Sequence, residues 1–261
     1  MTSDRLRGIN AILNHLAESD NTSSYSSDNV NPYVLRRIAR HISSIESNLG
    51  DRKAFVVEFG ARAGALGKML SEIFEGINYL GVEPCLPSDR KCFNIYESTC
   101  EQICQDSLGL QILGKADIIV YADVLEHLVD PWSHLKLLSE HSKKGVVIVA
   151  SLPNILHHSF LSSLGKGRFD YEEWGVMDLT HLRFFTLSTM HELFQATGWD
   201  STQHDFDAAA DPDGLRLINE YRAGELEAIN FGNFSYYIRS NDDALNVASY
   251  QFILSAVKAI T

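Results

Sequence analysis

The stretch AFVVEFGARAGALGKML, residues 54–70, decides the fold of this chain. It begins as an apolar, β-branched run that is typical of a buried strand, passes through a turn with Gly60 and Gly64, and continues as a helical pattern to about residue 75. A helix that starts directly after such a turn points its first backbone N–H groups at the loop, where they favour an anionic group. The stretch therefore predicts a site for a nucleotide-like ligand.

Arg62 is the unusual residue of this turn. A large cation stands there, where a loop of this kind is expected to carry a glycine that permits close backbone approach. We expect the backbone to accommodate Arg62 with a negative φ and an outward side chain. From that position its guanidinium either lies in solvent or binds the carboxylate of a ligand. A third reading is that ligand binding is weakened or lost.

Strand and helix patterns alternate downstream of this stretch. Apolar strands are expected at 54–59, 78–83, 93–98, 116–122, 145–152, 200–208 and 249–257. Helices are expected at 64–75, at 131–142 after an Asp130 cap, and from Thr186 or Ser188 to 198. Alternation of this kind predicts an α/β fold with a mostly parallel sheet and helices on both faces.

Two segments lie outside this alternation. Residues 1–50 are expected to form an N-terminal helical segment, with helices over 4–17 and 32–48 joined by a flexible polar linker. The main domain is expected over 51–261, with a helical lid inserted around 205–243. We leave open whether the N-terminal helices cover the pocket or form a homodimer contact.

Composition limits the partners. The chain has 261 residues and a formal net charge of −12, which argues against nucleic-acid binding because phosphate neutralisation needs an excess of Lys and Arg. The local basic run Arg36, Arg37, Arg40 and His41 has helical spacing and is interpreted as a solvated helix face. The sequence shows no membrane-length apolar run and a polar, acidic start unlike a signal peptide, so we expect a cytoplasmic protein.

No metal is expected from the sequence. The four cysteines, Cys85, Cys92, Cys100 and Cys104, form no C-x-x-C pair and are interpreted as free thiols. Glu126 and His127 are adjacent, and adjacent residues of a helix do not face each other.

The residues that follow the strands are the candidate ligand contacts, because ligands bind at the carboxyl ends of the strands in such sheets. Glu83 follows the second strand and is expected to accept hydrogen bonds from both hydroxyls of a ribose. The glycines Gly60, Gly64 and Gly67 do not match the G-x-G-x-x-G pattern of dinucleotide sites, so an NAD-dependent dehydrogenase is disfavoured. Glu58 would repel a pyrophosphate but suits a ligand that carries an ammonium and a sulfonium.

Five segments in this order resemble a class I S-adenosylmethionine-dependent methyltransferase of the bacterial small-molecule type 11/23 group: VVEFGARAGALG, YLGVEP, ADIIVYADVLEHLVDP, SLPN and GVMDLTHLRFFT. The resemblance covers about residues 32–260. It implies a Rossmann-like, doubly wound sheet of seven mostly parallel strands with an antiparallel last strand, and S-adenosyl-L-methionine as cofactor. Glu58, Gly60 and Gly64 would frame its methionine end, Glu83 its ribose, and Ser98 or Thr99 its adenine, while Ala122, Asp123 and Val124 would line the sulfonium side.

The acceptor side carries the candidate catalytic residues. Methyl transfer to an oxygen needs a base, and His is the usual choice. His181 is expected over the methyl group with Asp178 as its orienting partner, and His127 near the cofactor. Candidate acceptor contacts are His157, Tyr171, Trp174 and Arg183. A structural, hydrogen-bonded role is the alternative for each histidine, and core packing is the alternative for the aromatic residues.

These observations favour methyl transfer to a small molecule, with O-methylation of a sugar or sugar-linked metabolite as the first hypothesis. The alternatives are N- or C-methylation in natural-product tailoring, or a non-catalytic partner protein with a methyltransferase fold.

Overall fold

The computed structural model describes residues 30–85 and 94–259, without the side chains of 46–48, 101 and 202–205. The helix expected over 4–17, the linker after it and Cys92 lie outside the described residues. The helix expected over 32–48 is α2, Pro32–Leu49, and the Asn31 side chain caps it by accepting from the backbone N–H groups of Tyr33 and Val34.

A seven-stranded sheet forms the centre of the molecule, in the order β3-β2-β1-β4-β5-β9-β6. The first five strands in this order, β3, β2, β1, β4 and β5, are parallel to one another. Strand β9 runs antiparallel to both β5 and β6. The bounds are β1 Phe55–Phe59, β2 Asn78–Glu83, β3 Ile95–Glu97, β4 Ile118–Ala122, β5 Val147–Pro153, β6 Trp199–Ala210 and β9 Ser249–Lys258. The expected α/β class with a mostly parallel sheet is confirmed.

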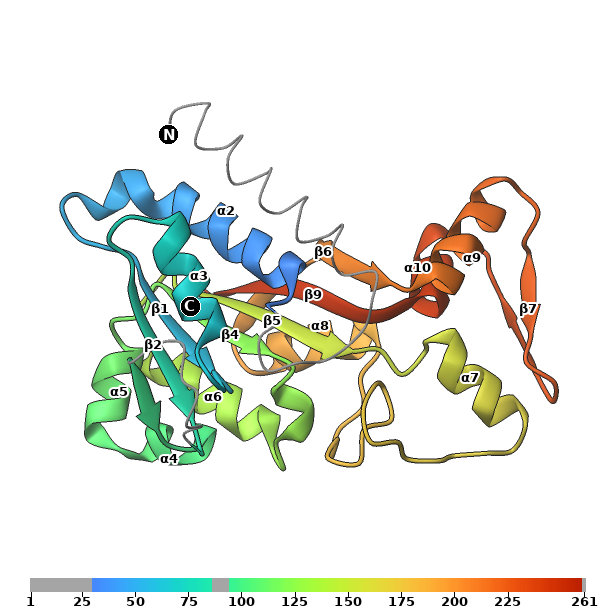
Figure 1. Cartoon of the computed structure of the whole chain (residues 1–261), viewed down its shortest axis with the longest axis horizontal. Coiled ribbons are helices and arrows are strands. Elements are labelled where there is room, and N and C mark those ends of the chain that lie inside the picture. Colours follow the sequence, from blue (N-terminus) through green and yellow to red (C-terminus); the bar gives the residue numbers. More distant parts are fainter. Residues whose placement is uncertain (1–29, 86–93, 260–261) are drawn as a thin grey trace.

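Helices cover both faces of this sheet (Figure 1). One face packs against α2 and α3, Ala65–Ile73. The other packs against α4 Cys100–Gln105, α5 Ser107–Leu113, α6 Pro131–His141 and α8 Leu187–Ala196. Successive residues of β4 alternate between the two cores, with Ile118 and Val120 on the α2 side and Ile119 and Tyr121 on the other. This two-sided burial explains why the strand is continuously apolar.

The basic run on α2 is not the solvated face that its spacing suggests. Arg37 is buried and its Nε donates to Asp207 Oδ2 at 2.7 Å, while Arg36 also pairs with Asp207. His41 Nε2 lies 2.8 Å from the hydroxyl of Ser255. Only Arg40 is exposed. The interpretation was wrong because α2 lies on the sheet beside polar residues of β6 and β9, which a sequence pattern of α2 alone does not reveal.

A smaller body lies beyond the ends of β5, β6 and β9 (Figure 1). It contains α7 His158–Gly165, α9 Pro212–Arg222, α10 Asn241–Ala248 and the antiparallel hairpin of β7 Ala228–Asn230 and β8 Ser235–Tyr237. These elements share a separate apolar core. The lid expected around 205–243 is therefore not all helical, because β6 continues to Ala210 and the hairpin lies inside this range.

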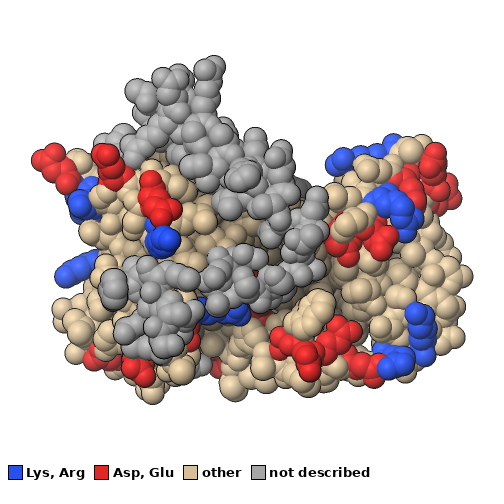
Figure 2. All heavy atoms as spheres, in the orientation of Figure 1, with Lys and Arg blue, Asp and Glu red and all other residues tan. Residues whose placement is uncertain are grey.

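The surface and the cysteines add little to the architecture. On the face of the molecule that Figure 2 shows, acidic and basic side chains of the described residues are interspersed. Cys100 and Cys104 are buried in the core beside α6, and Cys85 is exposed. None of the helices in the described residues has the length and hydropathy to cross a membrane.

Close contact between α3 and β2 generates a stability prediction. A Cβ on Gly67 would lie 2.3 Å from Cε1 of Tyr79, so Gly67→Ala forces the ring or the helix to shift. We expect a loss of about 1–3 kcal/mol of unfolding free energy, reduced by the better helix propensity of alanine. Urea unfolding measures it.

Lys68→Ala on the exposed side of the same helix is the matched control and should change stability by less than about 0.5 kcal/mol. Equal stability of Gly67→Ala and Lys68→Ala would contradict the close packing.

Candidate functional site

The carboxyl ends of β1, β2 and β4 meet at one edge of the sheet. β1 lies between the other two, with Glu58 opposite Gly81 on β2 and Val120 on β4. The chain therefore brings Glu58, Glu83 and Asp123 to the same edge, as the sequence predicts.

The turn after β1 is packed against both neighbouring strands. The N–H groups of Gly60 and Ala61 donate to the Val82 carbonyl at 2.9 and 3.2 Å. Gly60 has a φ of 69°, and a Cβ there would lie 2.7 Å from Cγ2 of Val124. Gly64 has a φ of 79° and precedes α3 without a capping side-chain hydrogen bond. The first turn of α3 thus starts without a capping side chain, as at helix ends that bind anions.

Arg62 has a left-handed backbone, with a φ of 46°. The expected negative φ is therefore wrong, and the residue is exposed. Its backbone N–H donates to Glu83 Oε2 at 2.8 Å, which ties the turn to β2. Its guanidinium lies close enough to Glu58 and Asp123 to lower the pKa of both carboxyls against the effect of their burial. A positive φ costs about 1 kcal/mol in an L-residue, so this arginine is held in strain.

Glu83 ends β2 and faces this turn. Its second carboxylate oxygen accepts from the Cys85 N–H at 3.4 Å. The neighbouring Ser98 N–H donates to the Glu83 carbonyl at 3.1 Å, which places the end of β3 beside it. Thr99 is the N-cap of α4 and its hydroxyl accepts from the Gln102 N–H at 3.1 Å. The Thr99 side chain is thus engaged in a capping box, which the T-x-x-Q spacing could have indicated.

Glu58 is buried and accepts a short hydrogen bond from the Tyr79 hydroxyl. Burial raises the pKa of Glu58 to about 7, and the hydrogen bond from Tyr79 opposes this rise. Near neutral pH the group is therefore close to half-ionised, and a nearby cation would favour the ionised form. Tyr79 was not predicted from the sequence as a partner of Glu58. It lies on the neighbouring strand β2, opposite Val56 of β1.

Asp123 follows β4 with a φ of 56° and lies between Ala122 and Val124. Its Oδ1 accepts from the Ser151 hydroxyl at 2.9 Å and from the Gln251 amide. Burial raises the pKa of Asp123 to about 6. Ser151 and Gln251 were not linked to Asp123 in the sequence analysis, because β5 and β9 meet here only in the folded sheet.

His127 and His181 come together although they are far apart in sequence, with ring centroids 4.8 Å apart. His181 is buried, and burial lowers its pKa, so the ring is neutral near pH 7. Its Nδ1 lies 3.1 Å from the Val176 carbonyl oxygen, so this carbonyl, and not the expected Asp178, orients the ring. Asp178 instead accepts from the Thr180 hydroxyl at 2.5 Å, and Thr180 contacts His127 Nδ1 at 3.1 Å.

Glu126 lies beside these two histidines in the short 3-10 helix Leu125–His127. It is 1% exposed, and burial raises the pKa of its carboxyl well above the usual range, with a further contribution from Asp123. In the described part of the chain neither carboxylate oxygen has a hydrogen-bond partner.

The expected acceptor contacts lie in two places. Tyr171, Trp174 and Arg183 belong to the segment between α7 and α8, and His157 is the residue that precedes α7. Tyr171 and Trp174 are 47% and 63% exposed, so they are not core-packing residues. The Arg183 guanidinium donates to the carbonyls of Leu182 and Val129 and fixes the loop that carries His181. His157 is buried between α7 and α9, with Nδ1 2.7 Å from the Ser159 hydroxyl.

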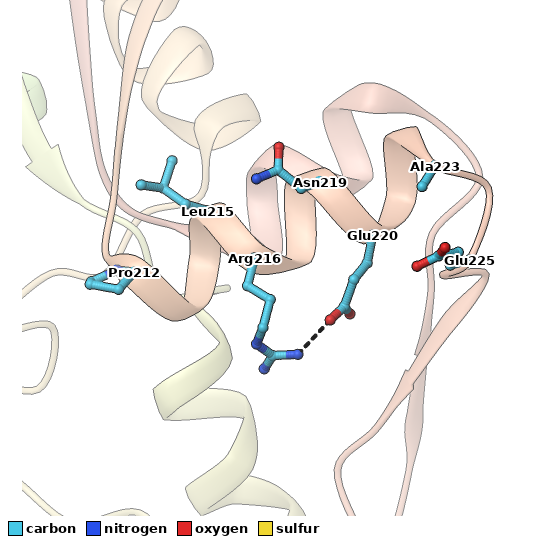
Figure 3. A pocket seen from close by; sticks show the side chains of 7 residues that line it. All are labelled: Pro212, Leu215, Arg216, Asn219, Glu220, Ala223 and Glu225. Carbon is cyan, nitrogen blue, oxygen red and sulfur yellow. Dashed lines mark hydrogen bonds and ion pairs between the residues drawn. The ribbon is translucent and has the colours of Figure 1, made fainter.

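A hollow on the outer side of α9 lies apart from these strand ends (Figure 3). Its side chains face solvent, and the Arg216 guanidinium points along the helix to Glu220, where Nη1 donates to Oε1 at 2.7 Å. The lining residues are Pro212, Leu215, Arg216, Asn219, Glu220, Ala223 and Glu225. We assign no functional residue to it.

Solved structures support the fold. A S-adenosylmethionine-dependent methyltransferase from Archaeoglobus fulgidus shares 17% identity, with 86% of this chain and 93% of that chain covered, and a TM-score of 0.51. The plantazolicin methyltransferase BamL, solved with a triazolic desmethylPZN analog and S-adenosylhomocysteine, shares 15% identity over 95% of this chain and 91% of its own, with a TM-score of 0.53. No curated protein matches the chain.

A family model decides the assignment. The model of the methyltransferase domain, type 23, matches residues 31–204, which is more than half of the chain and includes the carboxyl ends of β1, β2 and β4. The chain therefore belongs to the methyltransferase domain family and has the Rossmann-like fold of class I S-adenosylmethionine-dependent methyltransferases.

Proposed function

We propose that this enzyme transfers the methyl group of S-adenosylmethionine to a hydroxyl oxygen of a small molecule, with a sugar or sugar-linked metabolite as the first candidate. The observation that carries the cofactor assignment is Glu83. Its carboxylate stands at the carboxyl end of β2 and is fixed by the Arg62 N–H at 2.8 Å. In that place it can accept hydrogen bonds from both ribose hydroxyls of the cofactor.

The charges of the site suit this cofactor. Its sulfonium and ammonium are cations, and Glu58 and Asp123 are carboxyls whose raised pKa values, about 7 and about 6, leave them ready to ionise beside a cation. The carboxylate of the cofactor's methionine end suits the start of α3 and the Arg62 guanidinium. Gly60 and Gly64 supply the backbone that approaches this end, and Ala122 and Val124 flank the sulfonium side.

The acceptor is assigned to the side of His127 and His181. An oxygen acceptor needs a group that takes its proton or lowers its pKa, and the neutral His181 ring and its neighbours supply it. The exposed rings of Tyr171 and Trp174 offer apolar faces on which a sugar ring can stack. N- or C-methylation remains the alternative, since an amine that arrives neutral needs no base.

Cellular location and assembly stay predictions. Cys100 and Cys104 are buried and not joined in a disulfide within the described residues, which fits the reducing cytoplasm, where we place the protein. A homodimer contact through the N-terminal segment remains an expectation from the sequence, and we expect no nucleic-acid partner.

Glu83→Gln tests the ribose assignment. The amide can still accept from the Arg62 N–H, so the turn is preserved, but the charged acceptor is lost. We expect S-adenosylhomocysteine to bind about 10- to 100-fold more weakly, the scale of a hydrogen bond to a charged group of about 1.5–3 kcal/mol. Calorimetric titration measures the affinity.

Glu97→Gln is the matched control, because Glu97 is the exposed partner of Glu83 on β3. Unaltered affinity in Glu83→Gln would remove Glu83 from the ribose role. Failure of the unmodified enzyme to bind the cofactor would favour the non-catalytic reading.

Arg62 is tested by a pair of variants. Arg62→Gly removes both the guanidinium and the strain of the left-handed backbone, and Arg62→Ala removes only the guanidinium. We expect the free energy of unfolding of Arg62→Gly to be about 0.5–1 kcal/mol higher than that of Arg62→Ala. We also expect both to bind S-adenosylhomocysteine several-fold more weakly, as measured by calorimetry. Equal affinity in all three proteins would place the guanidinium in solvent.

His181→Ala tests the acceptor side. Loss of this ring should lower kcat by about 10²- to 10⁴-fold, because the acceptor oxygen keeps its proton. The dissociation constant of S-adenosylhomocysteine should change less than about twofold. Turnover is measured with labelled cofactor and an acceptor found by metabolite screening, with His141→Ala on the outer side of α6 as control. Undiminished turnover would exclude His181 from the reaction.

A further inference from the structure

The carboxyl group of Glu126 has no explanation in the fold or in cofactor binding. The residue is 1% exposed, and in the described residues neither oxygen accepts a hydrogen bond. A buried carboxyl group without a hydrogen-bond partner is disfavoured in either protonation state, and native proteins rarely keep one that does not bind something.

Each of the two histidines beside it has one ring nitrogen in the form that binds metals. His181 Nδ1 lies 3.1 Å from the Val176 carbonyl oxygen, which can only accept, so Nδ1 carries the proton. His127 Nδ1 lies 3.1 Å from the Thr180 carbonyl oxygen and is protonated for the same reason. Each ring therefore keeps a lone pair on Nε2. A backbone carbonyl that accepts from the other ring nitrogen is a common partner of metal-binding histidines.

The backbone brings the three donors together. The N–H groups of Leu182 and Arg183 both donate to the Glu126 carbonyl, at 2.9 and 3.0 Å, which fixes the His181 loop against the 3-10 helix. One ligand atom from each of Glu126, His127 and His181 lies within 4.8 Å of the others. Donors bound about 2.1 Å from one tetrahedral ion lie about 3.4 Å apart, so each pair of donors would have to approach by up to about 1.4 Å to close the site.

We propose that Glu126, His127 and His181 form a binding site for one divalent transition-metal ion. Two imidazoles and one carboxylate are donors that Zn²⁺, Fe²⁺ and Co²⁺ accept, whereas Mg²⁺ prefers oxygen donors. On an α-helix the adjacent Glu126 and His127 would not face each other, and no metal was expected there from the sequence. The folded chain adds His181 from a distant loop and places the adjacent pair in a 3-10 turn.

A second group, His157, His158 and Asp211, does not carry the same inference. Asp211 already caps α9, accepting from the Gly214 N–H at 2.7 Å, and also lies 3.2 Å from His158 Nε2. Its carboxylate is therefore accounted for by the fold. This difference makes the second group a matched control.

The role of the ion rests on the proposed function, although the binding site does not. Three protein ligands leave open positions for an acceptor oxygen, and the ion would lower the pKa of a hydroxyl bound there. The hydroxyl would release its proton to solvent, the oxygen would form its bond to the methyl carbon, and the carbon–sulfur bond would break with its electron pair on sulfur. The products are the methyl ether, neutral S-adenosylhomocysteine and one proton. His181 then acts as a ligand of the ion.

Co²⁺ titration of the full chain after chelator treatment tests the site, with calorimetry for stoichiometry and visible absorption for coordination. We expect one Co²⁺ per chain at this site, with Mg²⁺ bound at least 10-fold more weakly. Glu126→Gln and His181→Ala should each weaken Co²⁺ binding by about 10- to 100-fold or more. His158→Ala should leave it unchanged. Circular dichroism checks that each variant is folded, and His127→Asn replaces any variant that is not.

The outcomes separate this inference from the proposed function. No Co²⁺ binding, or Co²⁺ binding that Glu126→Gln and His181→Ala do not change, overturns the metal site. S-adenosylhomocysteine binding in chelator would still support the cofactor assignment in that case. Co²⁺ binding without any cofactor binding would support the metal site and contradict the proposed function.

Discussion

The constraint on which this structure depends is the crowding of one turn between two strands. Gly60 has room for no side chain because Val124 fills the space, and the Gly60 and Ala61 N–H groups are both directed to the Val82 carbonyl. This fixes the turn against the ends of β2 and β4. The start of α3 and the carboxylate of Glu83 then take their places from it, since the next N–H, that of Arg62, donates to Glu83. A methyltransferase needs such a rigidly held turn because positioning contributes much of its rate.

The charge of the site depends on two buried carboxyl groups. Glu58 and Asp123 reach the same sheet edge, and burial raises the pKa of both, to about 7 and about 6. Their hydrogen bonds come from Tyr79, Ser151 and Gln251, which lie on three other strands. The sheet thus holds two carboxyls that a cationic ligand would ionise. Arg62 lies near both carboxyl groups. The cation that replaces an expected glycine in the turn therefore also lowers the pKa of Glu58 and Asp123 against the effect of their burial.

The proposed acceptor side consists of a loop that is held against a 3-10 turn. Two backbone hydrogen bonds to the Glu126 carbonyl bring His181 to His127, and backbone carbonyls orient both rings. Asp178 serves this arrangement through Thr180 and not through His181. Among the described residues the Glu126 carboxyl at the centre has no hydrogen-bond partner, and the proposed metal ion would bind it together with the two histidines.

The sequence by itself determined the α/β class, the bounds of β2 and α6 to within a residue or two, and the meeting of Glu58, Glu83 and Asp123, because strand periodicity and strand-end position are local properties of the chain. Only the tertiary structure decided the rest. The positive φ of Arg62 follows from packing between strands, the burial of Arg37 from contact with Asp207, and the hairpin within the expected lid from a third core. Four partners in the site come from distant segments: Tyr79, Ser151, Gln251 and His181, which is the third member of the Glu126 group. A local sequence pattern does not indicate which distant segments become neighbours.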